Sequence, residues 1–264
     1  MLLMRIRFAL NKPKFLLITM SYNYLAKFYD FFVEDEPMDL FVNFIKTAIK
    51  KYCPSTKSIL ELGSGTGNVL ILLSKRFETF GIDSSEKMVK LAKKKDSNTI
   101  YRVQDMRDFN FQRKFEVIIS MFDTINHLTK LKDWQTVFDK AGKHLEDNGL
   151  FIFDINTEYQ LDEIAKQRFF ITDDAKGNII TLEKIKKRNL LRWQFRIFIN
   201  QKNGFYKLQK ENIDEVSFPL IKVKEILINK GFKILSVTEI DGSCIKSKSK
   251  RAFFVCQKSK EEQK

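Results

Sequence analysis

The sequence predicts an α/β fold, with a doubly wound, mostly parallel sheet of seven strands and an antiparallel β insertion. Three observations carry this prediction. Short apolar segments alternate with helical segments between residues 57 and 156, the pattern of crossovers in a parallel sheet. Apolar residues recur with a period of two between residues 168 and 217, which indicates antiparallel strands. A further helical segment and two more strands follow over 219–258.

The chain begins with a segment, residues 1–19, that carries basic residues but no acidic ones. Pro13 and Lys14 interrupt its apolar run, and no small-residue cleavage site follows. We expect these residues to be disordered or to precede the natural start, and one domain to span 20–264. From Ser21 to Tyr52 the apolar residues recur at helical spacing, and Pro54 ends the second of two helices.

The next elements alternate regularly. An apolar strand ends at Leu62 and leads into three glycines. Ser84 or Ser85 is placed to cap one of the helices that follow. The expected strands are 57–62, 79–83, 99–105, 115–122 and 150–156, and the expected helices between them are 67–76, 84–95 and 133–145.

The period of two is clearest in "RWQFRIFIN", which puts Trp193, Phe195, Ile197 and Ile199 on one face. Turn signals at 173–178 and 200–204 divide this region into three or four strands. Doubly wound sheets bind ligands at the carboxyl ends of their strands. The insertion 168–217 is therefore a candidate lid or substrate wall. Gly231 then ends a helix, before strands at 232–240 and 251–258.

The composition indicates which partners and compartments suit the chain. The net charge is +14, which suits a nucleic-acid partner, but the lysines are scattered along nearly every segment. No apolar run approaches the roughly 18–20 residues of a membrane helix. Cys53, Cys244 and Cys256 are far apart and form no CxxC pair, which argues against a metal site and favours a reducing, cytoplasmic compartment.

The stretch "ILELGSGTG" places Gly63, Gly65 and Gly67 between a strand and a helix. A glycine turn in this position lets the backbone approach a ligand closely. It is not a P-loop, because no Lys-Ser or Lys-Thr pair follows. It also differs from the dinucleotide fingerprint, since the third glycine comes one residue early. A plain tight turn stays open as the structural alternative.

Acidic residues end the next two strands. Asp83 follows Gly65 by 18 residues, a spacing at which a carboxylate can bind a ribose diol. It could equally cap the next helix. Asp105, at the end of the third strand, can accept a hydrogen bond from an amino group such as that of adenine, and Met106 can meet the ring.

These motifs together resemble those of the class I S-adenosylmethionine-dependent methyltransferases, whose fold is Rossmann-like, and the resemblance covers residues 21–258. Within that class the chain is most similar to bacterial small-molecule N-methyltransferases such as the amino-sugar dimethyltransferases. The resemblance implies S-adenosylmethionine as the cofactor. It assigns the methionine portion to the glycine turn and Glu61, the ribose to Asp83, and adenine to Asp105 and Met106.

"MFDTINHL" follows the fourth strand, where this fold places its reaction centre. His127 is the best candidate for a catalytic base, with a loop histidine or helix cap as the alternative. Asp123 and Asn126 are candidates for substrate contact. Tyr22 and Tyr29 lie in the helix that, in the family, often closes over the cofactor, although aromatic residues at helical spacing also serve packing.

We therefore expect direct methyl transfer to a small molecule, at an amine nitrogen before a hydroxyl. An RNA-directed methyltransferase remains open through basic charge, although "SMFDTIN" lacks the prolines of base N-methylating enzymes. A non-catalytic cofactor-binding module also remains open. Tyr206 and Lys210 have the spacing of short-chain dehydrogenases, but they lie on a predicted strand. The sequence specifies neither the acceptor nor the oligomeric state.

Overall fold

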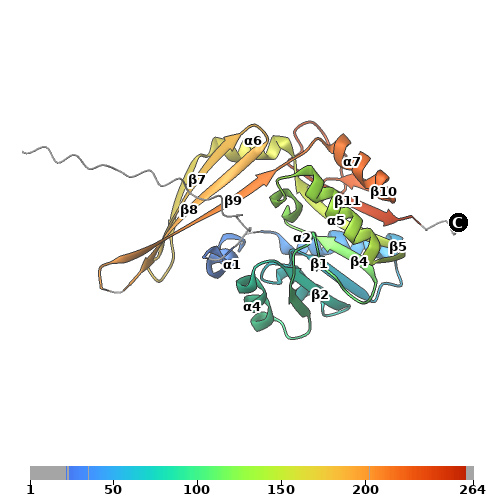
Figure 1. The fold of residues 1–264 in the computed structure, drawn as a ribbon, viewed down its shortest axis with the longest axis horizontal. Coiled ribbons are helices and arrows are strands. Elements are labelled where there is room, and N and C mark those ends of the chain that lie inside the picture. Colours follow the sequence, from blue (N-terminus) through green and yellow to red (C-terminus); the bar gives the residue numbers. More distant parts are fainter. Residues whose placement is uncertain (1–21, 23, 35, 202, 260–264) are drawn as a thin grey trace, which may run out of the picture.

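The structure is a computed structural model that describes residues 22, 24–34, 36–201 and 203–259. It contains a sheet of seven strands and a second sheet of four. The larger sheet forms the body of the molecule, and the smaller one projects from one end of it (Figure 1). The leader expected over residues 1–19 lies outside the described residues. No helix in the described part of the chain combines the length and the apolar character needed to span a bilayer.

The seven-stranded sheet has the order β10-β11-β5-β4-β1-β2-β3. Neighbouring strands pair in parallel from β3 to β5, and β11 runs antiparallel to both of its neighbours. The predicted α/β fold with a mostly parallel sheet is confirmed. Its strands are β1 (Ser58–Leu62), β2 (Glu78–Asp83), β3 (Ile100–Val103), β4 (Phe115–Ser120), β5 (Leu145–Asn156), β10 (Phe232–Thr238) and β11 (Arg251–Lys258).

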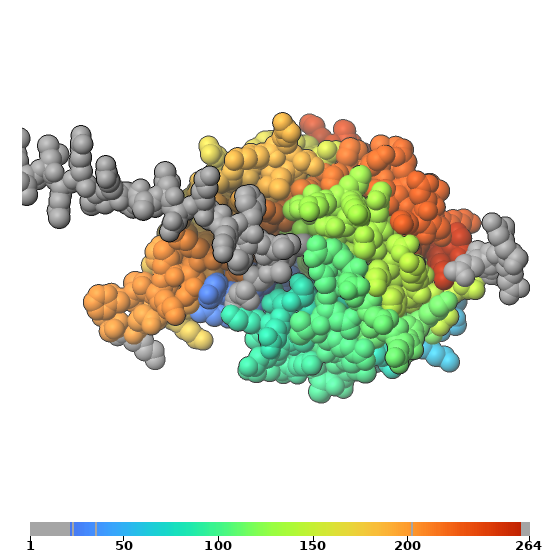
Figure 2. Space-filling view, in the orientation of Figure 1, coloured from blue at the N-terminus to red at the C-terminus, as the bar shows by residue number. Residues whose placement is uncertain are grey.

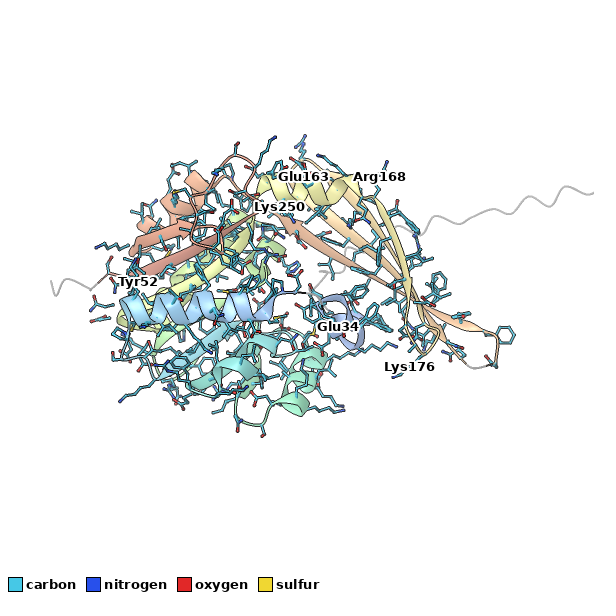
Figure 3. All side chains as sticks on the ribbon, turned by 180° about the vertical axis from the view of Figure 1, so that it is seen from behind. Glu34, Tyr52, Glu163, Arg168, Lys176 and Lys250 are labelled. Atoms are coloured by element: carbon cyan, nitrogen blue, oxygen red, sulfur yellow. The ribbon has the colours of Figure 1, made fainter. Side chains whose placement is uncertain are left out.

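Helices cover both faces of this sheet, each over its own apolar core. One face carries α5 (Leu131–His144) and α7 (Leu220–Asn229). The other carries α2 (Met38–Tyr52), α3 (Asn68–Leu73) and α4 (Glu86–Lys95). Figure 3 shows α2 from behind, lying along the body with Tyr52 at its end. Because helices cover both faces of the sheet, all five residues of β1 are buried, including the polar Ser58 and Glu61.

The insertion folds as an antiparallel sheet of four strands, β6 (Phe169–Asp173), β7 (Ile179–Lys187), β8 (Leu190–Asn200) and β9 (Tyr206–Val216). Its inner face packs on the N-terminal turns η1 (Leu25–Phe28) and α1 (Tyr29–Phe32). Leu25 and Phe28 join Phe195 and Ile197 in one cluster, as the alternating pattern requires. The far end of β8 and β9 extends beyond the body (Figure 2).

Three elements differ from the sequence-based expectation. The first of the two helices expected from Ser21 is the 3-10 turn η1 followed by the short helix α1, and Tyr22 precedes both. The helix α6 (Glu158–Lys166), capped by Thr157, precedes the insertion and was not predicted. Residues 146–149, "EDNG", lie between the expected helix 133–145 and the expected strand 150–156, but β5 begins earlier, at Leu145. Its pairing with β4 jumps from Leu145 to Leu150. Asn148 adopts a left-handed φ of 62° there, so these turn residues form a bulge within the strand.

Candidate active site

A cavity of about 700 Å³ opens at the carboxyl ends of the central strands. The strand order reverses at β1, which pairs with β2 on one side and β4 on the other, and such switch points are where doubly wound sheets bind ligands. Nine of the residues that the sequence singled out line this cavity: Tyr22, Tyr29, Gly63, Gly65, Asp83, Asp105, Met106, Asp123 and His127.

The glycine turn needs its glycines. Gly63, Gly65 and Gly67 have left-handed φ angles of 71°, 52° and 83°, which other residues rarely adopt. A Cβ at Gly63 would collide with the side chain of Thr124, and one at Gly67 with the hydroxyl of Tyr101. Gly65 has more space, because its nearest neighbour would lie 3.8 Å away. The backbone at Gly63 and Gly65 therefore faces the cavity directly.

Asp83 fixes the turn from the end of β2. One carboxylate oxygen accepts the Gly65 N–H at 2.9 Å, and the other accepts the Ser85 N–H at 2.8 Å. The cap of α4 is Ser85, whose hydroxyl oxygen accepts the Met88 N–H at 3.3 Å. Burial raises the pKa of Asp83, and the two N–H groups oppose that shift. Asp83 is thus available to a ligand as a hydrogen-bond acceptor in the cavity wall.

Asp105 and Met106 line the cavity near the end of β3. The Asp105 carboxylate is held by Arg107, with Nη2 at 2.5 Å from one oxygen and Nε at 3.0 Å from the other. Burial acts to raise the pKa of Asp105, but hydrogen bonds from Arg107 outweigh it, and the net shift is downward. The side chain therefore presents a charged acceptor.

Glu61 and Gly67 do not line the cavity. Glu61 is only 3% exposed, and its Oε2 atom has no hydrogen-bond partner among the described residues. Burial, followed by the nearby Asp83 and Asp154, raises the pKa of Glu61 well above its usual range. Glu61 thus lies behind the cavity wall, beside two acids.

His127 lies on η2 (Thr124–His127), the turn that follows β4. Its Nδ1 is 3.3 Å from the Asp214 carbonyl oxygen, and its Nε2 is 3.2 Å from the Tyr22 hydroxyl. Since a carbonyl oxygen only accepts, Nδ1 carries the hydrogen and the Nε2 of a neutral ring keeps a lone pair. That lone pair accepts the Tyr22 hydroxyl and faces the cavity.

Asn126 is fully buried and is not part of the cavity wall. Its Nδ2 donates to the carbonyl oxygens of Asn156 and Val216, at 3.0 and 2.8 Å, and its Oδ1 accepts the Asn156 N–H at 3.0 Å. The side-chain amide of Asn126 is thus hydrogen-bonded to backbone groups, and it links β5 to β9. The expected substrate contact at Asn126 is corrected to this structural role.

Arg251 and Glu215 line the cavity as well, and sequence reasoning missed both. Arg251 begins β11 and pairs with Asp154 at 2.6 Å and with Asp123 at 2.8 Å. Burial raises the pKa of Asp154 to about 6, against the effect of Arg251. In the sequence, Arg251 ends the lysine-rich stretch "IKSKSKR" at 245–251. The only signal for its role was its position at the start of a strand.

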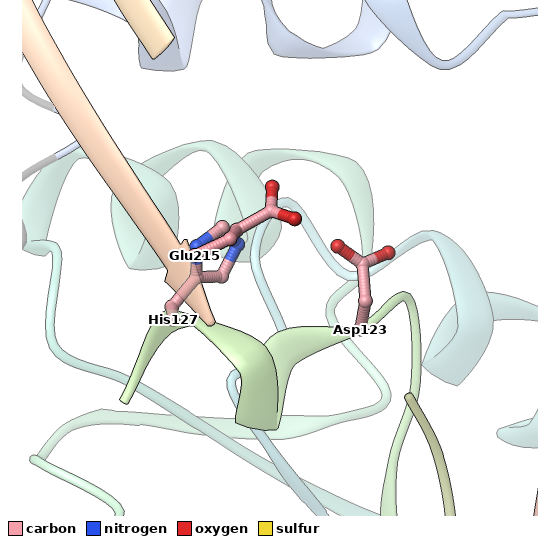
Figure 4. Close-up of side chains that lie close together, drawn as sticks. All are labelled: Asp123, His127 and Glu215. Atoms are coloured by element: carbon pink, nitrogen blue, oxygen red, sulfur yellow. The ribbon is translucent and has the colours of Figure 1, made fainter. Parts of the chain in front are cut away.

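Glu215, near the end of β9, is 4% exposed. Burial raises its pKa well above the usual range, and Asp123 adds to the shift. Figure 4 shows Glu215 and His127 side by side, with Asp123 facing them across a gap. One ring nitrogen or carboxylate oxygen from each of these three residues lies within 4.8 Å of the other two. One end of the cavity is therefore rich in hydrogen-bond acceptors and acidic groups.

Known proteins resemble this chain in sequence and in fold. Residues 59–149 match the family model described as "Methyltransferase domain". A relative from Geobacillus sp. (strain WCH70), provisionally named a methyltransferase, is 25% identical over 247 residues, which cover 90% of this chain and 100% of the relative.

Two further comparisons are informative. A crystal structure of a S-adenosylmethionine-dependent methyltransferase from Clostridium acetobutylicum ATCC 824 has a TM-score of 0.79 at 24% identity, over 90% of this chain and 99% of the other. The dTDP-3-amino-3,4,6-trideoxy-alpha-D-glucopyranose N,N-dimethyltransferase of Streptomyces venezuelae is 30% identical over 109 residues, which cover 41% of this chain and 46% of that enzyme.

Proposed function

We propose that the chain is a class I S-adenosylmethionine-dependent methyltransferase whose acceptor is a small molecule methylated at an amine nitrogen. The observation that carries this proposal is the acceptor-rich end of the cavity, where Asp123, His127 and Glu215 converge. Protonated amines bind such groups well, because each N–H donates to a charged or lone-pair acceptor. The sugar N,N-dimethyltransferase among the relatives supports the same acceptor class.

The rest of the cavity suits the cofactor. In our proposal the backbone at Gly63 and Gly65 holds the methionine portion, because it approaches the cavity without side chains. Asp83 accepts from the ribose hydroxyls, and Asp105 with Met106 holds adenine. Tyr22 and Tyr29, whose rings meet edge to face at 5.8 Å, close this part of the wall. Glu61 lies behind the cavity wall, and in our proposal it acts through its electrostatic interaction with Asp83.

When bound, S-adenosylmethionine supplies a methyl group on a sulfonium, which becomes a neutral thioether as the acceptor nitrogen takes the methyl group. The chain then has to position the acceptor and remove a proton. We assign the second task to His127. The Asp214 carbonyl fixes the ring so that the Nε2 lone pair faces the cavity.

We further propose that the insertion, residues 168–217, acts as a lid and substrate wall. It packs on the segment that carries Tyr22 and Tyr29, and it contributes Glu215 to the cavity. A wall built in this way restricts the acceptor to a molecule small enough to enter the cavity.

An RNA acceptor is the second candidate, and one observation favours it. A groove of about 380 Å³ beside η1 and α4 is lined by Tyr24 and by Lys27, Lys87, Lys90 and Lys94. Basic side chains next to an exposed ring are typical of sites for single-stranded nucleic acid. Such binding would weaken steeply with salt.

The test is a transfer assay with radiolabelled S-adenosylmethionine against pools of primary and secondary amines, matched alcohols and total RNA. We expect label in amines. Label confined to alcohols or to RNA would reject the amine proposal. Loss of both cofactor binding and transfer in Asp83→Ala would link the activity to this cavity, whereas transfer that persists without cofactor binding would indicate a contaminant.

A further inference from the structure

Three side chains from separate parts of the chain meet at the acceptor end of the cavity. Asp123 follows β4, His127 ends η2, and Glu215 lies near the end of β9, some 90 residues further along the chain. All three side chains line the cavity (Figure 4). One ring nitrogen or carboxylate oxygen from each lies within 4.8 Å of the other two. A bound group can therefore contact all three at once.

The dimensions of this cluster suit a nitrogen. The three atoms lie within 4.8 Å of one another, so an atom at their centre lies up to about 2.8 Å from each, which is a normal N–H···O length. An ammonium group also has three N–H donors for three acceptors.

Two residues beside the cluster, Tyr22 and Arg251, affect which cation can bind there, and Arg251 favours an ammonium over a divalent cation. The Tyr22 hydroxyl already lies 3.2 Å from His127 Nε2, and the Arg251 guanidinium lies 2.8 Å from an Asp123 oxygen. Any cation that contacts Nε2 has to displace the Tyr22 hydroxyl and is repelled by Arg251. Because Coulomb repulsion scales with charge, Arg251 repels a divalent cation about twice as strongly as an ammonium.

The local charges are also unbalanced. Arg251 forms ion pairs with Asp123 and Asp154, and within the described ranges no ion pair reaches Glu215. Glu215 receives a long hydrogen bond, 3.5 Å, from Asn156 Nδ2. It is 4% exposed, and burial raises its pKa well above the usual range, because a buried carboxylate without a close cation tends to take up a proton. A cationic ligand beside Glu215 would stabilise its ionised form.

We infer that Asp123, His127 and Glu215 form an ammonium-binding site, through which the enzyme takes up its acceptor amine in the protonated form. This inference rests on the proposed amine methyl transfer and narrows it. The acceptor is a cationic amine that carries at least one N–H at pH 7, and Glu215 determines the preference for it over a neutral alcohol. The N–H that faces His127 then gives its proton to Nε2 before the nitrogen is methylated.

The site can be tested by calorimetric titration of the full chain, saturated with S-adenosylhomocysteine, with cyclohexylammonium and with cyclohexanol. The two probes share a ring but differ in charge and donors. We expect cyclohexylammonium to bind about tenfold or more tightly than cyclohexanol. Glu215→Gln should abolish that difference. The matched control Glu225→Gln, on the exposed surface of α7, should retain it.

A further probe needs no variant and so covers the case in which Glu215→Gln does not fold. N,N,N-trimethylcyclohexylammonium keeps the charge but has no N–H donor, and we expect it to bind at least about tenfold less tightly than cyclohexylammonium. Equal binding of cyclohexylammonium and cyclohexanol overturns the inference, as does equal binding of the two ammonium probes. Saturable Mn²⁺ binding that Glu215→Gln removes would also overturn it, in favour of a metal site.

These results are separable from the proposed function. If labelled methyl reaches an amine and Glu215→Gln leaves KM for that amine unchanged, the ammonium site fails while amine methylation stands. If cyclohexylammonium binds through Glu215 but no amine in the pools accepts label, the proposed function fails and the site stands.

Discussion

Replacing Arg251 with methionine tests the ion pairs that hold the loop after β4. Arg251 Nη1 lies 2.6 Å from an Asp154 oxygen, and Nη2 lies 2.8 Å from an Asp123 oxygen. Asp154 is fully buried, and removing one partner of a buried ion pair typically costs about 3–5 kcal/mol. In a chain of this size each kcal/mol lowers Tm by about 2–4 °C. We therefore expect Arg251→Met to lower Tm by about 10 °C near pH 7.5.

The loss should depend on pH in a defined direction. Burial raises the pKa of Asp154 to about 6 from an ordinary value of 3.8, and removing Arg251 would raise that pKa further. An acid with a raised folded-state pKa binds more protons folded than unfolded, so stability falls as pH rises between the two values. At pH 5 Asp154 is protonated in the variant and needs no counter-charge. The deficit of Arg251→Met relative to wild type should therefore be smaller at pH 5 than at pH 7.5.

Thermal unfolding followed by circular dichroism at both pH values measures this. Arg196→Met is the matched control, because its guanidinium lies 3.9 Å from Glu183 at the surface, where an ion pair contributes about 1 kcal/mol or less. If Arg251→Met and Arg196→Met had the same Tm at pH 7.5, or if the deficit of Arg251→Met were unchanged at pH 5, the reasoning would be refuted.

Three further predictions concern the cavity. Asp83→Asn should weaken S-adenosylhomocysteine binding by about tenfold or more, because an amide cannot accept from both N–H groups that Asp83 holds; an unchanged Kd by calorimetry would contradict this. Gly63→Ala combines a left-handed φ of 71° with a collision at Thr124, so we expect a Tm decrease and loss of cofactor binding, and retention of both would count against the turn geometry. His127→Gln should lower turnover by about 10²–10⁴-fold while cofactor Kd stays constant, and unchanged turnover at every pH would remove His127 as the base.

The grouping of Gly63, Gly65 and Asp83 along one cavity could be predicted from the sequence because it depends on neighbouring strands. Gly63, Gly65 and Asp83 lie at the ends of adjacent strands, and parallel pairing brings those ends together. The spacing along the chain therefore encodes the spacing in space. The seven-stranded sheet was predictable for the same reason, since each crossover joins strands that pair or lie close together.

The end of the cavity that Glu215 and Arg251 line could not be predicted in this way. Glu215 is one of several charged residues in β9, and the packing of the insertion on η1 and α1 brings it to the cavity. Arg251 follows a lysine-rich segment, and its partners Asp123 and Asp154 come from two other strand ends. The reverse error occurred at Asn126, because a polar residue next to a predicted base proved to be a buried tie between β5 and β9.

The two ends of the cavity come from different parts of the chain, so the acceptor preference can change separately from cofactor binding. The groups proposed to hold the cofactor come mostly from the strand ends and the turns that follow them, whereas Glu215 comes from the insertion. Glu215 is not hydrogen-bonded to Asp83, Gly63 or Gly65 in the structure described here. Tyr22, which contacts His127 and Tyr29, is the side chain that both ends of the cavity share. Because groups without direct contact contribute nearly additively, substitutions at Glu215 should alter acceptor preference more than cofactor affinity. Measuring Kd for S-adenosylhomocysteine beside acceptor KM in Glu215→Gln tests that independence, and a parallel loss of both would show that the two ends of the cavity are coupled.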